Sequence, residues 1–437
     1  MNLDFENHNR EKQFYLDVQK NLENNKLGNQ CLNDKNLDKA LYYYRKNILS
    51  LNSQSIDFRN IALVYEIKKD YLKSIRYLNL ALELDMNDDK TYFKLGLSYY
   101  NLGNFAKAEE NFKNSFKIDN QNSEALNFWT KILIQQGKWF SKDEECFLKK
   151  NLTKSSISKN GIFYICLLIN NILLNRNRLN GEIFNSIKNT TKNLEQTLNT
   201  LPKSIYSYFI FLIKLNNQII NFSNFKSSKT IKNIYHIGES HSLSFVNQII
   251  STCNTSYKIK PQIVFGAKAW HLGNAELNIF KFHFKYYIKN IEELSTVLIS
   301  FGEIDCRSDE GIINAYLNSN HNGYNIEHFV NSTVTTYIEF CEKNLMNKKI
   351  KSIYLGVPAP LLDKIDKKKD DLRLEIIECF NKKMKQVCKE RCLFFIDTYH
   401  FTKNKIGTSN QKYMIDNNHL NFKFLKVIQK KLIEFNL

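Results

Sequence analysis

Two residue types that can together cleave an ester occur far apart in the second half of the sequence. Ser240 stands in the segment Gly-Glu-Ser-His-Ser after an apolar run, and His419 ends the segment Asp-Asn-Asn-His near the C-terminus. A serine hydroxyl is a poor nucleophile until a neighbouring base removes its proton, and histidine does this near neutral pH. Asp416 can fix the imidazole tautomer and stabilise its cation. These residues predict a catalytic set of Ser240, His419 and Asp416.

Each member of this set has a structural alternative. Ser240 or Asp416 can cap the helix that follows it, and His419 can be a surface histidine. His241, directly after Ser240, either lines the pocket or packs in the core. The segment Gly-Glu-Ile-Asp-Cys-Arg follows another apolar run and contains further chargeable groups. Its members Glu303, Asp305 and Arg307 form either a structural ion-pair network or a substrate-binding set.

The elements that must position these residues alternate in type from residue 231 onward. Short β-rich apolar runs predict strands at Lys232–Ile237, Gln262–Phe265, Thr296–Phe301, Lys351–Val357 and Cys392–Ile396. Helical patterns cover Leu243–Cys253, Ile326–Leu345, Asp370–Arg391 and Phe422–Phe435. Strands that alternate with helices indicate a parallel sheet covered on both faces. Ligands bind at the carboxyl ends of such strands, where the Ser240 and Glu303 segments begin.

Taken together, the three segments resemble the SGNH/GDSL hydrolases, over residues 231–437. The resemblance implies a flavodoxin-like, three-layer α/β domain, which we place at residues 229–437. It also implies that Ser240 is the nucleophile, although Gly-Glu-Ser stands where the family has Gly-Asp-Ser. The family's second block supplies a glycine amide to the oxyanion hole. Gly266, directly after a predicted strand, is the candidate for that amide.

One position departs from the family pattern. The family's third block reads Gly-x-Asn-Asp, and here Ile304 replaces the asparagine, which removes a side-chain oxyanion donor. Arg307 is a candidate replacement, held by Glu303 or Asp305. Three functions remain open: a serine esterase acting on an acyl ester such as an O-acylated sugar, an acyltransferase using the same residues, or a non-catalytic adaptor.

The first third of the chain contains an internal repeat. Residues 21–54, 55–88 and 89–122 align as three blocks of 34 residues, and a partial fourth begins at Ser123. Small residues recur at the eighth position of each block (Gly28, Ala62 and Gly96) and at the twentieth (Ala40, Ser74 and Ala108). Large residues recur at the twenty-fourth position (Tyr44, Leu78 and Phe112). Small residues let the two helices of a repeat approach closely. One helical hairpin cannot bury its own apolar face, so the repeats must stack on one another.

This period and pattern resemble the tetratricopeptide repeat. The resemblance implies an α-helical solenoid over residues 1–140 that binds a protein or peptide partner, although a solenoid that only caps or dimerises the enzyme fits equally. Residues 141–228 are predicted to be a helical connecting region, with apolar clusters at 162–174 and 205–215. This region contains no residue pattern that indicates chemistry.

Composition narrows the remaining possibilities. The net charge of +18 comes from lysines spread along the chain, so we expect no nucleic-acid partner. The nine cysteines form no CxxC pair, and no cluster of ligand types predicts a metal or a cofactor. The N-terminus is polar, and no apolar run reaches the roughly 20 residues of a membrane span. We therefore expect a soluble, cytoplasmic protein of bacterial type.

Overall fold

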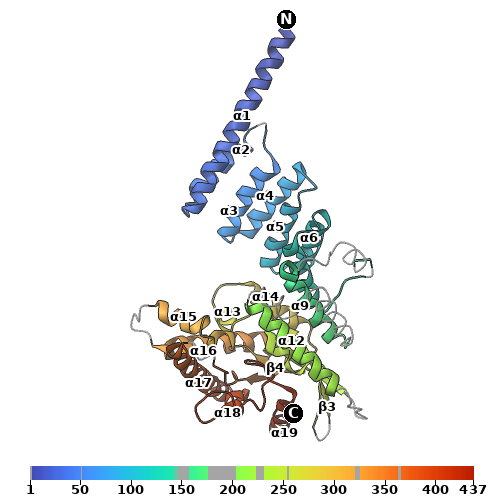
Figure 1. Ribbon diagram of the computed structural model, residues 1–437, viewed down its shortest axis with the longest axis vertical. Coiled ribbons are helices and arrows are strands. Elements are labelled where there is room, and N and C mark those ends of the chain that lie inside the picture. The colour runs from blue at the N-terminus through green and yellow to red at the C-terminus, as the bar shows by residue number, and fades with distance from the viewer. Residues whose placement is uncertain are drawn as a thin grey trace, which may run out of the picture. The chain divides into compact units, whose positions relative to one another are not determined.

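The structure, a computed structural model, describes residues 2–50, 52–141, 143–144, 157–175, 203–222, 231–252, 255–319, 325–362 and 366–437. Contacts divide the chain into two compact units, Met1–Thr153 and Lys154–Leu437, and each is described by itself (Figure 1). Among the described residues, no helix is long and apolar enough to cross a membrane.

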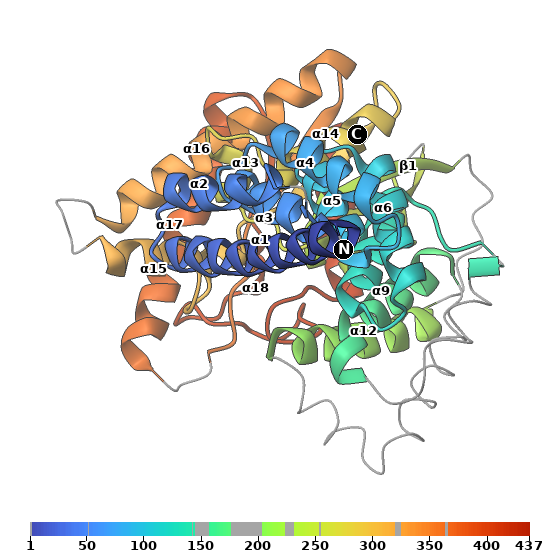
Figure 2. The same cartoon turned by 90° about the horizontal axis from the view of Figure 1, so that it is seen from above.

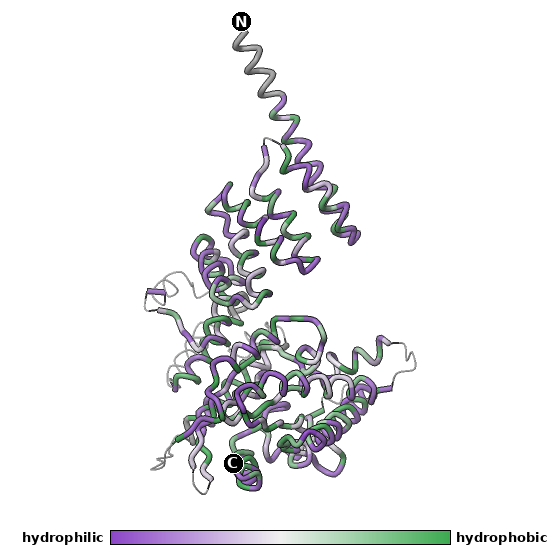
Figure 3. The backbone as a smooth tube through the Cα atoms, turned by 180° about the vertical axis from the view of Figure 1, so that it is seen from behind, coloured by the Kyte–Doolittle hydropathy of each residue, from purple (hydrophilic) through white to green (hydrophobic). Residues whose placement is uncertain are grey.

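The described part of the first unit consists of helices that pack in sequence order. Its main helices are α1 (Asn2–Asn33), α2 (Leu37–Ile48), α3 (Ser55–Ile67), α4 (Tyr71–Leu84), α5 (Asp89–Asn101), α6 (Phe105–Ile118) and α7 (Ser123–Gln135). Figure 3 shows hydrophilic and hydrophobic segments alternating along these helices, as expected for elements with one buried face. The predicted helical repeat is confirmed.

The repeat period reappears in the residues that begin the second helix of each hairpin. Asn36, Asp70 and Asn104 are the N-caps of α2, α4 and α6. Each cap side chain accepts a hydrogen bond from the backbone amide three residues later, on a lysine in every case. These bonds satisfy amides that the first turn of a helix leaves unpaired. The same local chemistry therefore starts each of these three helices.

The small residues of the repeat are needed for helix contact. A Cβ atom built on Gly28 would lie 2.4 Å from the ring of Tyr44, and one on Gly96 would lie 2.6 Å from the ring of Phe112. Tyr44 and Phe112 are themselves fully buried. The large residue at the twenty-fourth position thus fills the space left by the small residue at the eighth.

The second unit contains a six-stranded sheet. Its strands are β1 (Ile231–Gly238), β2 (Ile249–Ser251), β3 (Ser256–Ile263), β4 (Thr296–Ser300), β5 (Lys351–Leu355) and β6 (Phe394–Ile396), in the order β2-β3-β1-β4-β5-β6. All neighbours pair in parallel except β2, which pairs antiparallel with β3 at the edge. The predicted α/β class with a parallel sheet is confirmed.

The predicted helix over residues 243–253 is wrong. The chain forms a 3-10 helix there, η1 (Ser240–Phe245), and then the edge strand β2. Between them, Asn247 adopts a positive φ of 59°, which ends any helix. Pairing with β3, a long-range interaction, decides the structure of this apolar run.

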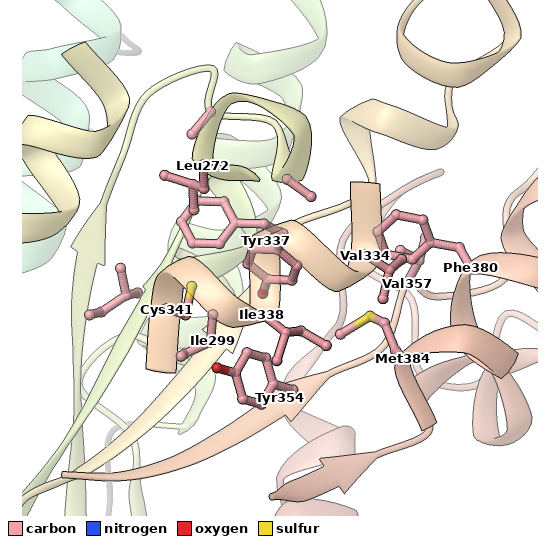
Figure 4. Packing of buried hydrophobic residues seen from close by; sticks show 14 of the residues in the cluster. Leu272, Ile299, Val334, Tyr337, Ile338, Cys341, Tyr354, Val357, Phe380 and Met384 are labelled. Atoms are coloured by element: carbon pink, nitrogen blue, oxygen red, sulfur yellow. The ribbon is translucent and has the colours of Figure 1, made fainter. Parts of the chain in front are cut away.

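Helices and loops cover both faces of the sheet. On one face, α13 (Ala269–Gly273), α14 (Ile279–Asn290), α15 (Gly311–Asn318), α16 (Ile326–Leu345) and α17 (Lys367–Glu390) enclose the main hydrophobic core. In Figure 4, Tyr337, Ile338 and Cys341 lie over Ile299 and Tyr354 of the sheet. On the other face, His236 of β1 stacks on Phe245, which in turn packs on Phe424.

The connecting region contributes two described helices to the second unit. They are α9 (Ile157–Leu173) and α12 (Lys203–Phe222), which contact each other and lie side by side in Figure 2. Asn247 donates hydrogen bonds to the carbonyls of Ile172 and Leu173, and Gln218 accepts one from the amide of Phe422. Both helices are therefore tied to the α/β elements. Residues 176–202 and the predicted domain boundary between residues 228 and 229 lie outside the described residues.

The chain ends with short elements beyond β6. These are α18 (Thr398–Thr402), the 3-10 helix η4 (Phe422–Phe424) and α19 (Leu425–Glu434). The loop between α18 and η4 contains Asp416 and His419. A β-bridge between Met414 and Leu420 closes the base of this loop. The loop is thus held at both ends of the Asp-Asn-Asn-His segment.

Candidate active site

Ser240 lies just past the carboxyl end of β1. This strand ends at Gly238, where a Cβ atom would come within 2.3 Å of the Ser300 hydroxyl on β4, so only glycine fits. Glu239 then caps η1, because its side chain accepts a hydrogen bond from the amide of His241. These two residues place Ser240 as the first residue of η1, at the sheet edge where α/β folds bind ligands.

Ser240, His419 and Asp416 form one chain of hydrogen bonds. His419 Nε2 lies 2.8 Å from Ser240 Oγ, and His419 Nδ1 lies 2.8 Å from Asp416 Oδ2. Burial opposes ionisation of the Asp416 carboxyl, but the charge of His419 and its hydrogen bond hold the pKa of Asp416 well below its usual range. An ionised Asp416 favours the tautomer with the proton on Nδ1, so Nε2 is left to accept the serine proton.

Asp416 also shapes the loop that carries the histidine. Its Oδ1 accepts hydrogen bonds from the backbone amides of Asn418 (2.9 Å) and His419 (2.7 Å). The amide of Ile415 donates to the carbonyl of His419 at 2.9 Å. The three-residue spacing of Asp416 and His419 thus comes from a tight turn, in which one carboxylate holds both the backbone and the ring.

Helix α12 contributes a side chain that contacts the histidine. Phe211, fully buried, stacks on the His419 imidazole with ring centroids 3.8 Å apart and an interplanar angle of 17°. One turn earlier, the buried hydroxyl of Tyr208 has no hydrogen-bond partner among the described residues. Burial and the charge of Glu239 raise the pKa of Tyr208. The connecting region therefore takes part in the site, contrary to the prediction that it contains no chemistry.

Glu239 is a second possible acceptor for the Ser240 proton. Its Oε2 accepts a hydrogen bond from Ser240 Oγ, and its Oε1 pairs with His241 Nδ1. Burial opposes ionisation, but the charge and hydrogen bond of His241 lower the pKa of Glu239 to about 2. A carboxylate with so low a pKa is a weak base near neutral pH. The Ser240 hydroxyl has one proton to give to either neighbour, and the weak basicity of Glu239 favours His419 as the group that takes it.

His241 connects the nucleophile to the histidine loop. Its Nδ1 pairs with Glu239, and its Nε2 lies 2.9 Å from the carbonyl oxygen of Asn418. Burial lowers its pKa, but the charge of Glu239 outweighs this and raises the pKa of His241 to about 9. The protonated ring donates from both nitrogens. Of the two predicted alternatives, the structure places His241 beside the site, where it holds the loop.

Two backbone amides that follow the neighbouring strands β1 and β3 have no acceptor among the described residues. Within the described residues, the N–H groups of Ser240 and Gly266 donate to no protein acceptor. Gly266 follows β3, the parallel neighbour of β1, and has a φ of 68°. Ile304 is buried and supplies no donor. The site thus offers candidate oxyanion donors from the backbone, without the side-chain amide of the family's third block.

Glu303, Asp305 and Arg307 divide into two arrangements. Glu303 Oε2 receives two hydrogen bonds from Arg307, from Nε at 2.9 Å and Nη2 at 2.7 Å. Asp305 instead accepts the amides of Ala269 and Trp270 at the start of α13. Burial raises the pKa of Asp305 to about 6. Arg307 is therefore held by Glu303, and Asp305 positions a helix.

Sequence reasoning missed Phe211, Asn418 and Arg373. Arg373, on α17, donates through Nη2 to Glu303 (3.4 Å) and to the side chain of Asn418 (3.3 Å). No motif marks Phe211 or Arg373, because they reach the site from the separate helices α12 and α17. Asn418 had one available signal, its place inside the Asp-x-x-His segment.

Three side chains at the site could also hold a metal ion. Glu239, His241 and His419 each offer one ligand atom, and these atoms lie within 4.8 Å of one another. Each of the three already pairs with another group of the site, Glu239 with His241 and His419 with Ser240 and Asp416. A metal ion would have to break these pairs. That the protein holds no metal stays a prediction.

Comparison with known proteins identifies the repeats. A family model for the tetratricopeptide repeat matches residues 89–122, and a second one matches residues 60–88. These two segments are similar to tetratricopeptide repeats. The first match has the same bounds as the third predicted block. A comparison with curated proteins returned no match.

Solved structures resemble each half of the chain. One of them is the second tetratricopeptide-repeat domain of human RPAP3, solved in complex with an HSP70 peptide. It is 19% identical to this chain, and the match covers 26% of this chain and 97% of that chain with a TM-score of 0.26. Another match is a GDSL-like lipase from Bacteroides thetaiotaomicron, with 16% identity, 52% of this chain and 100% of that chain covered, and a TM-score of 0.32. At these TM-scores, neither match supports any conclusion about the site.

Proposed function

We propose that the protein is a serine-dependent ester hydrolase whose tetratricopeptide repeats bind a protein or peptide partner. The observation that supports this function is the hydrogen-bonded chain from Ser240 through His419 to Asp416. The 2.8 Å between the serine oxygen and the imidazole nitrogen is within the range for direct proton transfer. The Asp416 carboxylate lies on the other nitrogen of the same ring, and its pKa is held below its usual range by His419, against the effect of burial.

The reaction proceeds in two halves. His419 Nε2 takes the proton of Ser240 as Oγ attacks the ester carbonyl carbon, and Asp416 stabilises the imidazolium. The amides of Ser240 and Gly266 donate to the oxygen that becomes negative. His419 then returns the proton to the leaving alcohol, which leaves an acyl-Ser240 ester. A water molecule, deprotonated by His419, releases the acid and restores the serine.

The family resemblance suggests an O-acylated sugar as the substrate. The site's buried position favours a small acyl group, because Ser240 and His419 are only 7% and 6% exposed. An acetyl ester is therefore the first substrate to test. The fold alone sets neither the acyl group nor the sugar.

The test is labelling of the purified full-length protein with a fluorophosphonate probe, together with p-nitrophenyl acetate hydrolysis. We expect Ser240→Ala and His419→Ala to abolish labelling and to lower kcat on the order of 10³-fold or more. Ser244→Ala is the matched control. Its hydroxyl is also buried in η1 and has no hydrogen-bond partner in the described part of the chain, so labelling should persist.

A folded wild-type protein that takes no label and leaves p-nitrophenyl acetate intact would exclude the esterase. Labelling that survives Ser240→Ala would place the reactive residue elsewhere. Circular dichroism of each variant separates loss of chemistry from loss of fold.

A further inference from the structure

Two arginines converge on one buried carboxylate beside the nucleophile. Glu303 receives Arg307 on Oε2, through the two hydrogen bonds described above, and Arg373 on Oε1 at 3.4 Å. The Glu303 side chain is 5% exposed, and the side chains of Arg307 and Arg373 are 28% and 12% exposed. Arg307 follows β4 and the short 3-10 helix Ile304–Cys306, and Arg373 lies on α17. The pair is thus built from two separate elements.

Among the described residues of the polar cluster around Ser240, Arg373 has no carboxylate of its own. The cations His241, Arg307 and Arg373 face two carboxylates, Glu239 and Glu303. His241 counts as a cation because its pKa is about 9, raised by Glu239 against the effect of burial. The nearby Asp416 is already used by His419 and by two backbone amides. Glu310, 3.9 Å from Arg307, pairs with Lys268 at 2.9 Å.

The guanidinium of Arg373 is poorly used. Its hydrogen bonds in the described part of the chain both go through Nη2, and both are long. Its Nε is buried without a partner there. A guanidinium has five N–H donors in a planar fork that fits carboxylate and phosphate oxygens. A mostly buried cation with unused donors is costly unless an anion completes it.

The position of Arg373 connects its unused donors to the reaction. Asn418, whose side chain accepts from Arg373, directly precedes His419 in the chain, and its carbonyl pairs with His241. Arg307 lies close enough to Glu239 to be influenced by its charge. Glu239 in turn contacts Ser240. The two arginines therefore lie in the same polar network as the nucleophile.

We propose that Arg373, with Arg307 beside it, binds a carboxylate or phosphate group carried by the ester substrate. The anionic group replaces the missing partner of Arg373 and orients the ester toward Ser240. The substrate class is therefore an acylated molecule with a nearby negative charge, such as an acylated acidic sugar. This inference rests on the proposed esterase function, whose nucleophile belongs to the same network.

The test measures inhibition of p-nitrophenyl acetate hydrolysis by galacturonate, galactose and inorganic phosphate. Galacturonate has a carboxylate where galactose has a hydroxymethyl group, so this pair isolates the charge, and phosphate distinguishes the two kinds of anion. We expect an inhibition constant for galacturonate or phosphate at least roughly 10-fold lower than for galactose. Whichever of the two anions binds more tightly identifies the charged group.

Variants then locate the binding site. Arg373→Gln keeps a polar side chain but removes the charge, and should raise the inhibition constant of the anion roughly 10-fold or more. Arg373→Lys keeps the positive charge but loses the planar guanidinium. Its inhibition constant for the anion should lie between those of the wild type and Arg373→Gln. Arg391→Gln is the control. This variant removes an arginine at the other end of α17, where it pairs with Glu339 and Glu342. The inhibition constant of the anion should stay unchanged.

Equal inhibition by all three compounds, or an unchanged constant in Arg373→Gln, overturns the inference. If the wild type does not hydrolyse the ester, the esterase proposal fails instead, and thermal unfolding decides the anion site. A melting temperature that phosphate raises in the wild type but not in Arg373→Gln supports the site. An equal response in both proteins, or none in either, rejects it.

Discussion

The ring of Phe211 stacks on the imidazole of His419 at a centroid distance of 3.8 Å and an angle of 17°. The contact joins α12, which precedes the sheet in sequence, to a loop near the C-terminus. A ring in this position limits the rotation of the imidazole and keeps water from one of its faces. Its negative face also attracts the imidazolium that forms when His419 takes the serine proton.

We therefore predict that Phe211→Leu lowers kcat for p-nitrophenyl acetate roughly 10- to 100-fold, since small misplacement of a catalytic group has effects of this size. KM should change less, because the phenylalanine contacts the base. The matched control is Phe209→Leu, on the same helix and 1% exposed. Both variants should lose similar stability. Equal losses of kcat in the two variants would show that Phe211 acts only through packing.

A second prediction concerns the missing oxyanion donor. Ile304 occupies the position of the family's asparagine, and the structure offers backbone amides as candidate donors. Ile304→Asn adds a side-chain amide, so we expect kcat to rise about 10-fold, a part of the 10²–10³ that one such donor supplies in other enzymes. The measurement is steady-state hydrolysis of p-nitrophenyl acetate.

Ile304→Leu is the control for packing at this buried position, and its kcat should stay at or below that of the wild type. A folded Ile304→Asn protein with no gain would mean that this position does not face the developing oxyanion. Such a result would leave the backbone amides as the remaining candidate donors.

A third prediction follows from the pKa of His241. Glu239 raises it to about 9 in the folded protein, from the ordinary value of 6.5, despite burial. The pair therefore stabilises the fold fully below pH 6.5, and this stabilisation is lost as the pH rises from 6.5 through 9. A shift of this size corresponds to about 3 kcal/mol in the free energy of unfolding.

Urea unfolding of the wild type and of His241→Gln at pH 6 and pH 10 measures this effect. The variant should be less stable than the wild type at pH 6, and the difference should shrink at pH 10. Titrating groups that do not contact His241 are common to both proteins and cancel in the comparison. A difference that stays constant with pH would show that His241 is not protonated in the folded protein.

Much of the fold was predictable because local patterns specify it. The 34-residue period of small and large residues reappears as Gly28 against Tyr44 and Gly96 against Phe112. The strand that leads into Ser240 and the order of the site segments were predictable for a similar reason. A short buried strand has its own apolar signal, and parallel strands bring their carboxyl ends together. The Ser240, His419 and Asp416 side chains form one chain of hydrogen bonds, and their catalytic role stays a prediction.

Only the tertiary structure decided the rest of the site. The run after Ser240 forms a 3-10 helix and an edge strand because it pairs with β3, a partner that local composition does not reveal. Phe211 and Arg373 reach the site from α12 and α17, and neither lies in a motif. A phenylalanine or an arginine on an amphipathic helix looks the same in sequence whether it faces the core, the solvent or a catalytic group. Which one it faces depends on long-range packing, and packing is a property of the folded chain.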